Sequence, residues 1–444
     1  MTATLDRTEA PLTLDQPPPR GLRLVDQLGM WGNLGVSLLG FTGAYFVLYP
    51  LGDGVALSLV AAVTALLLGT VLGTAAVSIA AIPGTETGAP AMVLLRGLFG
   101  ARLSRLPTVL NIAQLLGWTT FELVTISTAL HQITPSVPRW SYVLAGGVVS
   151  TVLALRPLGW IRVLRRYVTV AVVAALAYLA VQLLRNPLPG LTHGTWHGFW
   201  IAVDTVIGVT VSWVPVASDY TRHSRSVRDT VLGSFVGYSL TQVACYGIGL
   251  IALVTVAKSG TDHQMFGAFM AVPVGTLAFA VLAVREVDQS FVDTYSTAIS
   301  VQNLRPRWDR RVLAVVIGAL ATVLALALDV HDYENFLILI GSLFVPLLGV
   351  LAVDYFVISR RSWNLTETAP ERWLMLVPWF VGFCAYQMIN PGYLGWWSRQ
   401  WGRVDRWLHF TPSTWMSASL ISFAVAALAT VPIGLLRRRE EAEC

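Results

Sequence analysis

Twelve apolar runs, each long enough to cross a lipid bilayer as a helix, follow one another along the 444-residue chain. A helix needs about 20 apolar residues to span the hydrocarbon core of a membrane. In lipid the backbone must satisfy its own hydrogen bonds, and runs of this length favour helices over strands. We therefore predict an all-α integral membrane protein with twelve transmembrane helices. The runs cover approximately residues 28–50, 55–80, 107–132, 140–155, 167–184, 199–220, 231–257, 272–300, 312–329, 335–358, 373–390 and 414–436.

Composition excludes several classes of protein. Charged residues make up 12% of the chain, whereas about 25% of a typical soluble protein is charged, so membrane lipids are the expected surroundings. An ATP-binding loop needs a lysine after a glycine-rich segment, and the sole lysine, Lys258, follows no such segment. The metalloprotease motif His-Glu-x-x-His and the hydrolase motif Gly-x-Ser-x-Gly do not occur either. Three scattered cysteines suggest neither a disulfide framework nor a metal site. We expect no enzyme, no cofactor and no nucleic-acid partner, and active transport would be driven by a gradient of Na⁺ or H⁺.

Basic residues are distributed unevenly between alternate loops. Of the 30 Lys and Arg residues, 23 fall in the two tails and every second loop, six fall in the opposite loops, and Arg285 lies inside a span. Cytoplasmic loops carry the excess of Lys and Arg, so both termini are predicted to be cytoplasmic, in the inner (plasma) membrane. Residues 1–24 are expected to form a disordered cytoplasmic tail, and residues 437–444 a second cytoplasmic tail.

Two spans are interrupted by glycine or proline. The first contains Gly32, Gly35, Gly40 and Gly43 within one crossing, and the sixth contains residues 208–215, which run from a glycine to a proline. Interruptions at corresponding positions of two five-helix halves indicate broken helices with a binding site between them near the middle of the membrane. The alternative is close helix packing through small residues.

Glu122 lies in the middle of the third span, one turn after Trp118 and on the face that also carries Gln114. Charge at this depth is costly and usually functional. An aromatic ring beside a carboxylate suits a flat heterocycle with N–H donors, because the ring stacks and the carboxylate accepts. Trp213, in the interruption of the sixth span, would supply a second ring. The alternatives are a carboxylate paired with a basic residue, and tryptophans that form core or anchor the protein at the membrane surface.

The eighth span is the most polar. Helical spacing places a set of acidic, amide and hydroxyl side chains on one face: Glu286, Gln289, Ser290 and Asp293. Arg285 and Asp288 lie together on another face and are predicted to pair. The oxygen atoms of the first of these faces suit a hard cation such as Na⁺, and a carboxylate can equally carry a proton. The alternative is a buried salt-bridge network that only locks helices together. Three further aspartates near span ends are interpreted as boundary or gating residues: Asp204, Asp219 and Asp354.

Four segments carry a resemblance to known motifs: residues 84–100, 116–118, 213–222 and 340–356. They resemble motifs of the purine–cytosine permease family of nucleobase–cation symporters, which includes hydantoin, allantoin and hydroxymethylpyrimidine transporters. The resemblance implies a LeuT-like five-plus-five inverted repeat over residues 25–361, with broken first and sixth helices and alternating access around a central site. It also implies two additional transmembrane helices over residues 362–436.

The resemblance further implies how a substrate is held. Family members stack a planar base between a Trp of the third helix and a Trp of the sixth, and Trp118 and Trp213 match those positions. One turn after the first Trp, members often carry a polar residue, here Glu122, which suggests a ligand with an amino group or a protonated ring nitrogen. The remaining predicted substrate-binding residues are Asn33, Gln114 and Asp293.

Within the family, residues 291–296 are most similar to the hydroxymethylpyrimidine branch. The predicted cargo is therefore cytosine or a thiamine-related aminopyrimidine such as hydroxymethylpyrimidine. A monomer is expected to be sufficient for its import. A purine, allantoin or a hydantoin-like compound stays open within the same fold. A membrane sensor or binding protein that transports nothing is a more remote alternative.

The coupling site departs from the family pattern. Sodium-coupled members place Ser and Thr hydroxyls of the eighth helix against backbone carbonyls of the first. This sequence has Asp288, Gln289 and Ser290 there, with Glu286 beside them and Arg285 just before. An arginine nearby repels Na⁺, which argues against sodium coupling, and an aspartate can take a proton. The choice of coupling ion therefore stays open between Na⁺ and H⁺.

Overall fold

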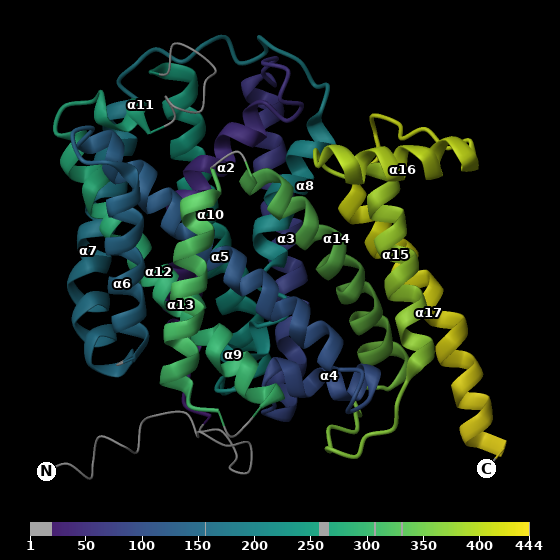
Figure 1. The fold of residues 1–444 in the computed structure, drawn as a ribbon. Helices are drawn as coiled ribbons and strands as arrows, with labels where there is room; N and C mark the ends of the chain where they lie inside the picture. Colours follow the sequence, from purple (N-terminus) through teal and green to yellow (C-terminus); the bar gives the residue numbers. More distant parts are fainter. Residues whose placement is uncertain (1–19, 156, 257–265, 306–307, 330–331, 444) are drawn as a thin grey trace, which may run out of the picture.

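The computed structural model describes residues 20–155, 157–256, 266–305, 308–329 and 332–443, which fold almost entirely into helices (Figure 1). Of the tail expected for residues 1–24, residues 1–19 lie outside the described residues. Lys258 lies outside them as well. Residues 20–23 lead into the first helix, and the Leu22 N–H donates to the carbonyl of His223 at 3.0 Å.

Each of the twelve apolar runs coincides with one helix or with two consecutive helices. In chain order these are α1 (Leu24–Leu34) with α2 (Leu38–Leu48), α3 (Leu59–Thr87), α5 (Arg105–Ile133), α6 (Arg139–Leu155), α7 (Pro157–Leu183), α8 (Phe199–Val211) with α9 (Ala217–Thr221), α10 (Val227–Thr255), α12 (Gly275–Leu304), α13 (Arg310–Ala327), α14 (Asp332–Ala352), α15 (Leu376–Ile389) and α17 (Ala418–Glu443). Three shorter helices lie in the connections: α4 (Ala91–Phe99), α11 (Gly267–Met270) and α16 (Gly395–Leu408). Figure 1 shows α4 and α9 near one end of the bundle and α11 and α16 at the other.

By length and composition, five of the described helices can cross a membrane, or six if the bent pair α1 and α2 counts as one span. Five further apolar helical segments are shorter: 139–155, 170–183, 199–211, 373–389 and 418–434. The helix α12 carries four charged residues from Arg285 to Asp293. The last helix, α17, continues through Glu443, so the described part of the predicted tail 437–444 is helical.

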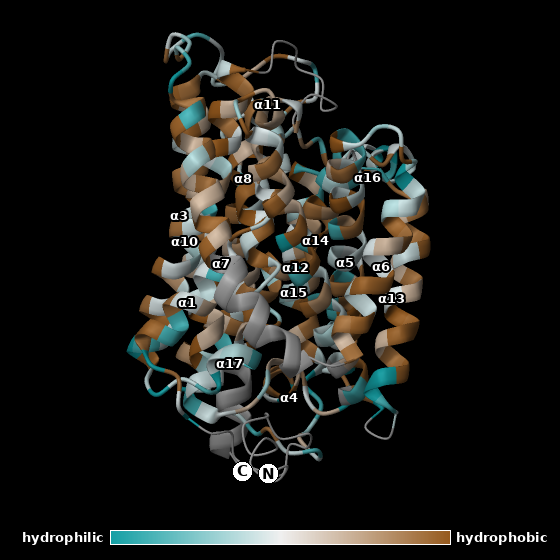
Figure 2. Cartoon of the chain, turned by 90° about the vertical axis from the view of Figure 1, so that its left-hand side faces the viewer, coloured by the Kyte–Doolittle hydropathy of each residue, from teal (hydrophilic) through white to brown (hydrophobic). Residues whose placement is uncertain are grey.

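The outer faces of the bundle are apolar, as expected for contact with lipid. On α13 the exposed side chains form one stripe: Val312, Val315, Val316, Leu320 and Val323. The opposite face of the same helix is buried in the protein and is made largely of Ala and Gly. Figure 2 shows hydrophobic residues along the middle of the helices and hydrophilic residues gathered towards the two ends. A soluble protein rarely exposes apolar area on this scale.

The helix contacts repeat with a period of five spans. Span one (α1) packs on span seven (α10), and span six (α8) packs on span two (α3), which is the same contact with the two halves exchanged. The pairs α5 with α12, and α6 with α13, each join corresponding spans of the two halves. This pattern is what a five-plus-five repeat requires. The two C-terminal helices α15 and α17 pack on each other and on α14.

The contact between α6 and α13 is reciprocal in detail. A Cβ added to Gly147 of α6 would overlap the hydroxyl of Thr322, and a Cβ added to Gly318 of α13 would overlap the hydroxyl of Thr151. Each threonine lies four residues after the glycine of its own helix and donates to the carbonyl of that glycine, at 2.7 Å in α6 and 2.6 Å in α13. The two helices therefore interlock through the same Gly-x-x-x-Thr arrangement.

The first and sixth spans are broken, as predicted. The axes of α1 and α2 meet at 63°, and Ser37 begins α2 as an N-cap whose hydroxyl accepts the Leu39 N–H at 3.0 Å. In the sixth span, residues 212–216 form turns between α8 and α9. Close packing also occurs, because a Cβ on Gly43 would overlap the Tyr246 hydroxyl of α10. The glycines of span one thus serve both the break and the contact with α10.

Candidate substrate-binding site

A pocket with about 540 Å³ of empty space, part of it open to solvent, lies between the two broken spans. Its walls come from the α1–α2 break, α5, the α8–α9 break, α10 and α12. Four predicted substrate-binding residues line this pocket together: Trp118, Glu122, Trp213 and Asp293.

Trp118 and Trp213 are held by different neighbours. Trp118 packs at a steep angle against Tyr333 and Phe336 of α14, with ring centroids 5.9 and 5.3 Å apart. The Trp213 indole N–H donates to the hydroxyl of Tyr238 at 3.1 Å. Each ring is 8% exposed, so both are almost enclosed by protein and both contribute aromatic surface to the pocket.

Glu122 and Asp293 bring two carboxyl groups into the pocket, from α5 and α12. They lie within hydrogen-bonding reach of each other and are both buried. Two carboxyl groups can form a hydrogen bond only when one of them carries a proton. This pair can therefore hold a proton between its two carboxyl groups.

Three polar side chains of α10 line the pocket and are absent from the sequence predictions: Tyr238, Gln242 and Tyr246. They lie four residues apart and so share one face of the helix. A polar stripe of this spacing within an apolar span was the signal that could have revealed them. Gln242 also donates through Nε2 to the carbonyl of Val206, at 3.3 Å.

Several buried polar atoms around the pocket have no hydrogen-bond partner among the described residues. They are Trp118 Nε1, Glu122 Oε2, Gln242 Oε1 and Tyr246 Oη. Buried polar groups in native proteins are nearly always hydrogen-bonded, and each exception calls for an explanation. Two donor-bearing groups and two acceptor oxygens that converge on one cavity suit a small polar molecule.

Two predicted substrate-binding residues do not line the pocket. Asn33 lies near the end of α1, where its backbone carbonyl accepts a hydrogen bond from Arg285. The side-chain amide of Gln114 donates to the carbonyl of Ser212 and to Asn111 Oδ1, both at 2.9 Å. Because Ser212 begins the break in the sixth span, Gln114 contacts that break.

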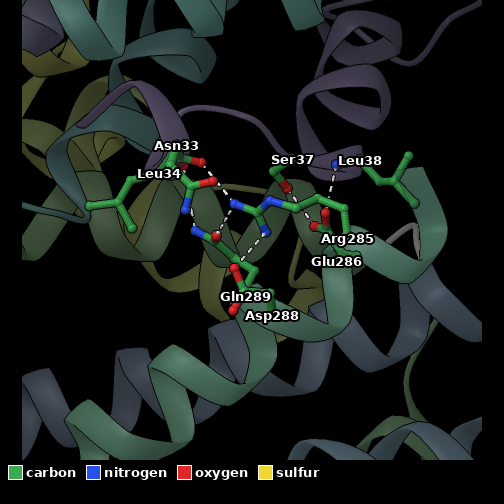
Figure 3. A network of polar contacts seen from close by, with 8 residues as sticks. All are labelled: Asn33, Leu34, Ser37, Leu38, Arg285, Glu286, Asp288 and Gln289. Carbon is green, nitrogen blue, oxygen red and sulfur yellow. Dashed lines mark hydrogen bonds and ion pairs between the residues drawn. The ribbon is translucent and has the colours of Figure 1, made fainter. Parts of the chain in front are cut away.

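The polar face of α12 reaches the break in the first span (Figure 3). Arg285 Nη1 lies 3.9 Å from Asp288 Oδ2, the pairing predicted from the sequence. The Glu286 carboxylate accepts hydrogen bonds from the Leu38 N–H at 2.9 Å and from the Ser37 hydroxyl at 2.5 Å. Glu286 therefore caps the start of α2.

The other two residues predicted to bind the coupling ion lie in different settings. Gln289 lines the pocket, and its Nε2 donates to the carbonyl of Leu34 at 3.4 Å. Ser290 is fully buried, and its hydroxyl has no hydrogen-bond partner among the described residues. Within the described ranges, no three His, Cys, Asp or Glu side chains form a metal-binding group.

The three aspartates near span ends contact backbone or side chains of neighbouring segments. Asp204 accepts hydrogen bonds from three groups at the start of α17: the Ser417 hydroxyl at 2.6 Å and the N–H groups of Ala418 and Ser419 at 2.8 and 3.1 Å. Asp219 accepts the Ala91 N–H of α4 at 2.8 Å. Asp354 pairs with Arg372. These contacts attach helix ends and loops at the boundaries of the bundle.

A helical bundle with two broken spans that enclose an aromatic, carboxyl-lined pocket is the architecture of a LeuT-like membrane transporter. Two solved structures share this fold: Mhp1 in an inward-facing conformation, at a TM-score of 0.77 and 14% identity over 98% of this chain and 95% of that one, and Mhp1 closed with bromovinylhydantoin bound, at a TM-score of 0.74 and 15% identity over 95% of each chain. Mhp1 is described as a nucleobase-cation-symport-1 family transporter.

Residues 48–372 match the family described as permease for cytosine/purines, uracil, thiamine, allantoin, and the chain belongs to this family. Among its relatives is the putative purine-cytosine permease YxlA of Bacillus subtilis, 22% identical over 332 residues that cover 70% of this chain and 71% of the relative. The cytosine permease of Escherichia coli is 22% identical over 317 residues, which cover 70% of this chain and 74% of that protein.

Proposed function

We propose that the protein is a secondary active transporter that imports a planar nucleobase-like heterocycle across the inner membrane by alternating access. The best candidates for the substrate are cytosine and a thiamine-related aminopyrimidine such as hydroxymethylpyrimidine. The observation that carries the proposal is the set of unpartnered polar atoms around a pocket walled by two tryptophans. A relative that is a cytosine permease supports the same class of cargo.

Each side chain has a chemical role in this proposal. The rings of Trp118 and Trp213 contact the faces of the heterocycle, where offset stacking is favourable. Glu122 accepts a hydrogen bond from an exocyclic amino group or a ring N–H, and Gln242 offers a second acceptor. Asp293 faces Glu122 and completes the polar edge of the site. The driving ion is Na⁺ or H⁺.

A hydantoin-like substrate is the second candidate. It is favoured by the closed Mhp1 structure, which has the same fold and contains bromovinylhydantoin. Hydantoins and aminopyrimidines are both flat and carry N–H donors, but a pyrimidine amino group matches a carboxylate acceptor better than a hydantoin carbonyl does.

Thermal unfolding of the purified protein with a panel of ligands tests the proposal. The panel contains cytosine, hydroxymethylpyrimidine, adenine, allantoin and a hydantoin, because a ligand that binds only the folded state raises the melting temperature. We expect cytosine or hydroxymethylpyrimidine to raise it most. Counterflow of the same compound in liposomes then tests transport. A folded protein that no member of the panel stabilises would contradict the proposed substrate class, and binding without counterflow would favour a sensor.

The substitution Glu122→Gln tests the carboxylate directly. Removing a charged acceptor weakens binding by about tenfold or more, so affinity and uptake should both fall while the protein still folds. Glu334→Gln is the matched control, because Glu334 is also a buried glutamate but does not line the pocket. Equal affinity in the Glu122 variant and the unmodified protein would remove Glu122 from the site.

A further inference from the structure

The break in the first span leaves two helix ends facing each other inside the protein. The last carbonyl groups of α1 lack partners within their own helix, as do the first N–H groups of α2. These ends carry partial negative and partial positive charge, respectively. Such an arrangement attracts a cation to the end of α1 and an anion to the start of α2.

Neighbouring side chains of α12 supply both charges (Figure 3). Arg285 Nη2 donates to the carbonyl of Asn33 at 2.8 Å, at the end of α1. Glu286 accepts the Leu38 N–H at 2.9 Å, at the start of α2. Since Arg285 is 3% exposed and an arginine stays protonated in proteins, a permanent positive charge lies against the end of α1.

We propose that the Arg285 guanidinium is a built-in cation that takes the place of a bound Na⁺ at this break, so that the protein binds and transports its substrate without sodium. The inference deepens the proposed function and rests on it for the role of the pocket. Arg285 itself does not line the pocket; it is a positioning residue that holds the end of α1, next to the pocket wall.

Three oxygen-bearing groups near the break that could coordinate Na⁺ already face protein donors. Gln289 Oε1 accepts from Arg285 Nη2 at 3.1 Å, and the carbonyl of Leu34 accepts from Gln289 Nε2. The Asp288 carboxylate lies 3.9 Å from Arg285 Nη1. A sodium ion at this position would have to displace these donors and approach a fixed positive charge in a medium of low dielectric constant.

Arg285 is not tied into α12 alone. Its Nε and Nη1 atoms have no hydrogen-bond partner among the described residues, and the contact with Asn33 crosses from α12 to α1. The guanidinium therefore links two separate helices through few hydrogen bonds. Such a link can form and break as the two helices move relative to each other. A coupling cation must likewise bind and leave during transport.

The first test measures the melting temperature of the ligand-free protein in sodium chloride and in choline chloride at equal ionic strength. We expect the same value in both, because the site already contains its cation. A saturable rise of the melting temperature in sodium would overturn the inference. This measurement needs no substrate, so it judges the inference even if the proposed substrate class fails.

The second test replaces the guanidinium. Arg285→Ala should lower the melting temperature and weaken cytosine binding by about tenfold or more, and added guanidinium or Na⁺ should restore part of both. Arg285→Lys keeps the charge and should stay insensitive to sodium, which provides a second measurement if the alanine variant does not fold. An alanine variant that behaves like the unmodified protein in choline, or a sodium-dependent lysine variant, would overturn the inference.

Arg139→Ala is the matched control. Arg139 also donates to backbone carbonyls at a helix end, those of Ala325 and Leu328 at 3.0 and 2.9 Å, but it lies outside the pocket and the break. Its removal should lower stability without creating any response to sodium. A sodium response equal to that of Arg285→Ala would show that the effect is not specific to the break, and would overturn the inference.

Discussion

Five carboxyl groups of this bundle fall into two groups according to what their oxygens contact. Those of Asp204, Asp219 and Glu286 accept hydrogen bonds from N–H groups at the starts of other helices. Those of Glu122 and Asp293 face each other in the pocket. The first group stabilises helix ends, where a negative charge is favourable, and the second group is available to a ligand.

At the scale of single residues, Asp204 provides a stability prediction. Asp204→Ala should leave three donors at the start of α17 without their acceptor, which costs roughly 1–3 kcal/mol of unfolding free energy. A thermal melt in detergent measures the loss. Asp53→Asn, in an exposed loop, is the control. Ligand affinity of the folded fraction should not change, since Asp204 does not line the pocket, and an unchanged melt would show that the cap contributes nothing.

Whole helices meet through small residues rather than through large apolar ones. Gly147 and Gly318 let α6 and α13 approach until each accommodates the threonine of the other. Lipid tails are as apolar as leucine, so close packing and not hydrophobic transfer drives such contacts. The same arrangement on both helices follows from their equivalent positions in the two halves of the repeat.

At the scale of elements, this interlock predicts a coupled pair of mutations. Gly147→Ala should force α6 away from α13 and cost roughly 1–3 kcal/mol. Adding Thr322→Ala removes the overlapping hydroxyl and should recover part of that loss, with a coupling of about 0.5–3 kcal/mol in a double-mutant cycle of thermal stability. Gly247→Ala is the control, because no atom lies within 4 Å of its added Cβ. Purely additive effects would argue against the interlock.

Across the whole molecule, the connections between helices are divided between the two ends of the bundle, and this division predicts how the protein is oriented in the membrane. The connection between α14 and α15 lies at the end that contains α4, since Arg372 donates to the carbonyl of Gly97 at 2.6 Å. The amphipathic helix α16 lies at the opposite end (Figure 1). The positive-inside rule predicts that the first end is cytoplasmic.

Cysteine labelling in intact cells measures this orientation. In a background without the native cysteines, Gln400→Cys in α16 should react with a membrane-impermeant thiol reagent added outside. Glu367→Cys, in the connection between α14 and α15, should react only after the cells are permeabilised. Both positions are exposed, so access to the reagent depends on the side of the membrane. Labelling in the reverse pattern would contradict cytoplasmic termini.

The sequence by itself determined the features that depend on neighbouring residues. Hydropathy located the helices, glycine and proline located both breaks, and helical spacing placed Glu122 on the same face as Trp118. The pairing of Arg285 with Asp288 follows from the same periodicity. These properties are local, because a helix forms its backbone hydrogen bonds within one turn.

Only the tertiary structure decided which buried polar groups meet. The partner of Glu286 is Leu38, 248 residues away in the chain, and the donors to Asp204 lie more than 200 residues further on. Gln114 contacts a helix break instead of the pocket, and α10 contributes three pocket residues that no motif revealed. A buried polar group must be hydrogen-bonded, and packing of the helices decides which group becomes its partner. The pattern of neighbouring residues does not show which distant residue that will be.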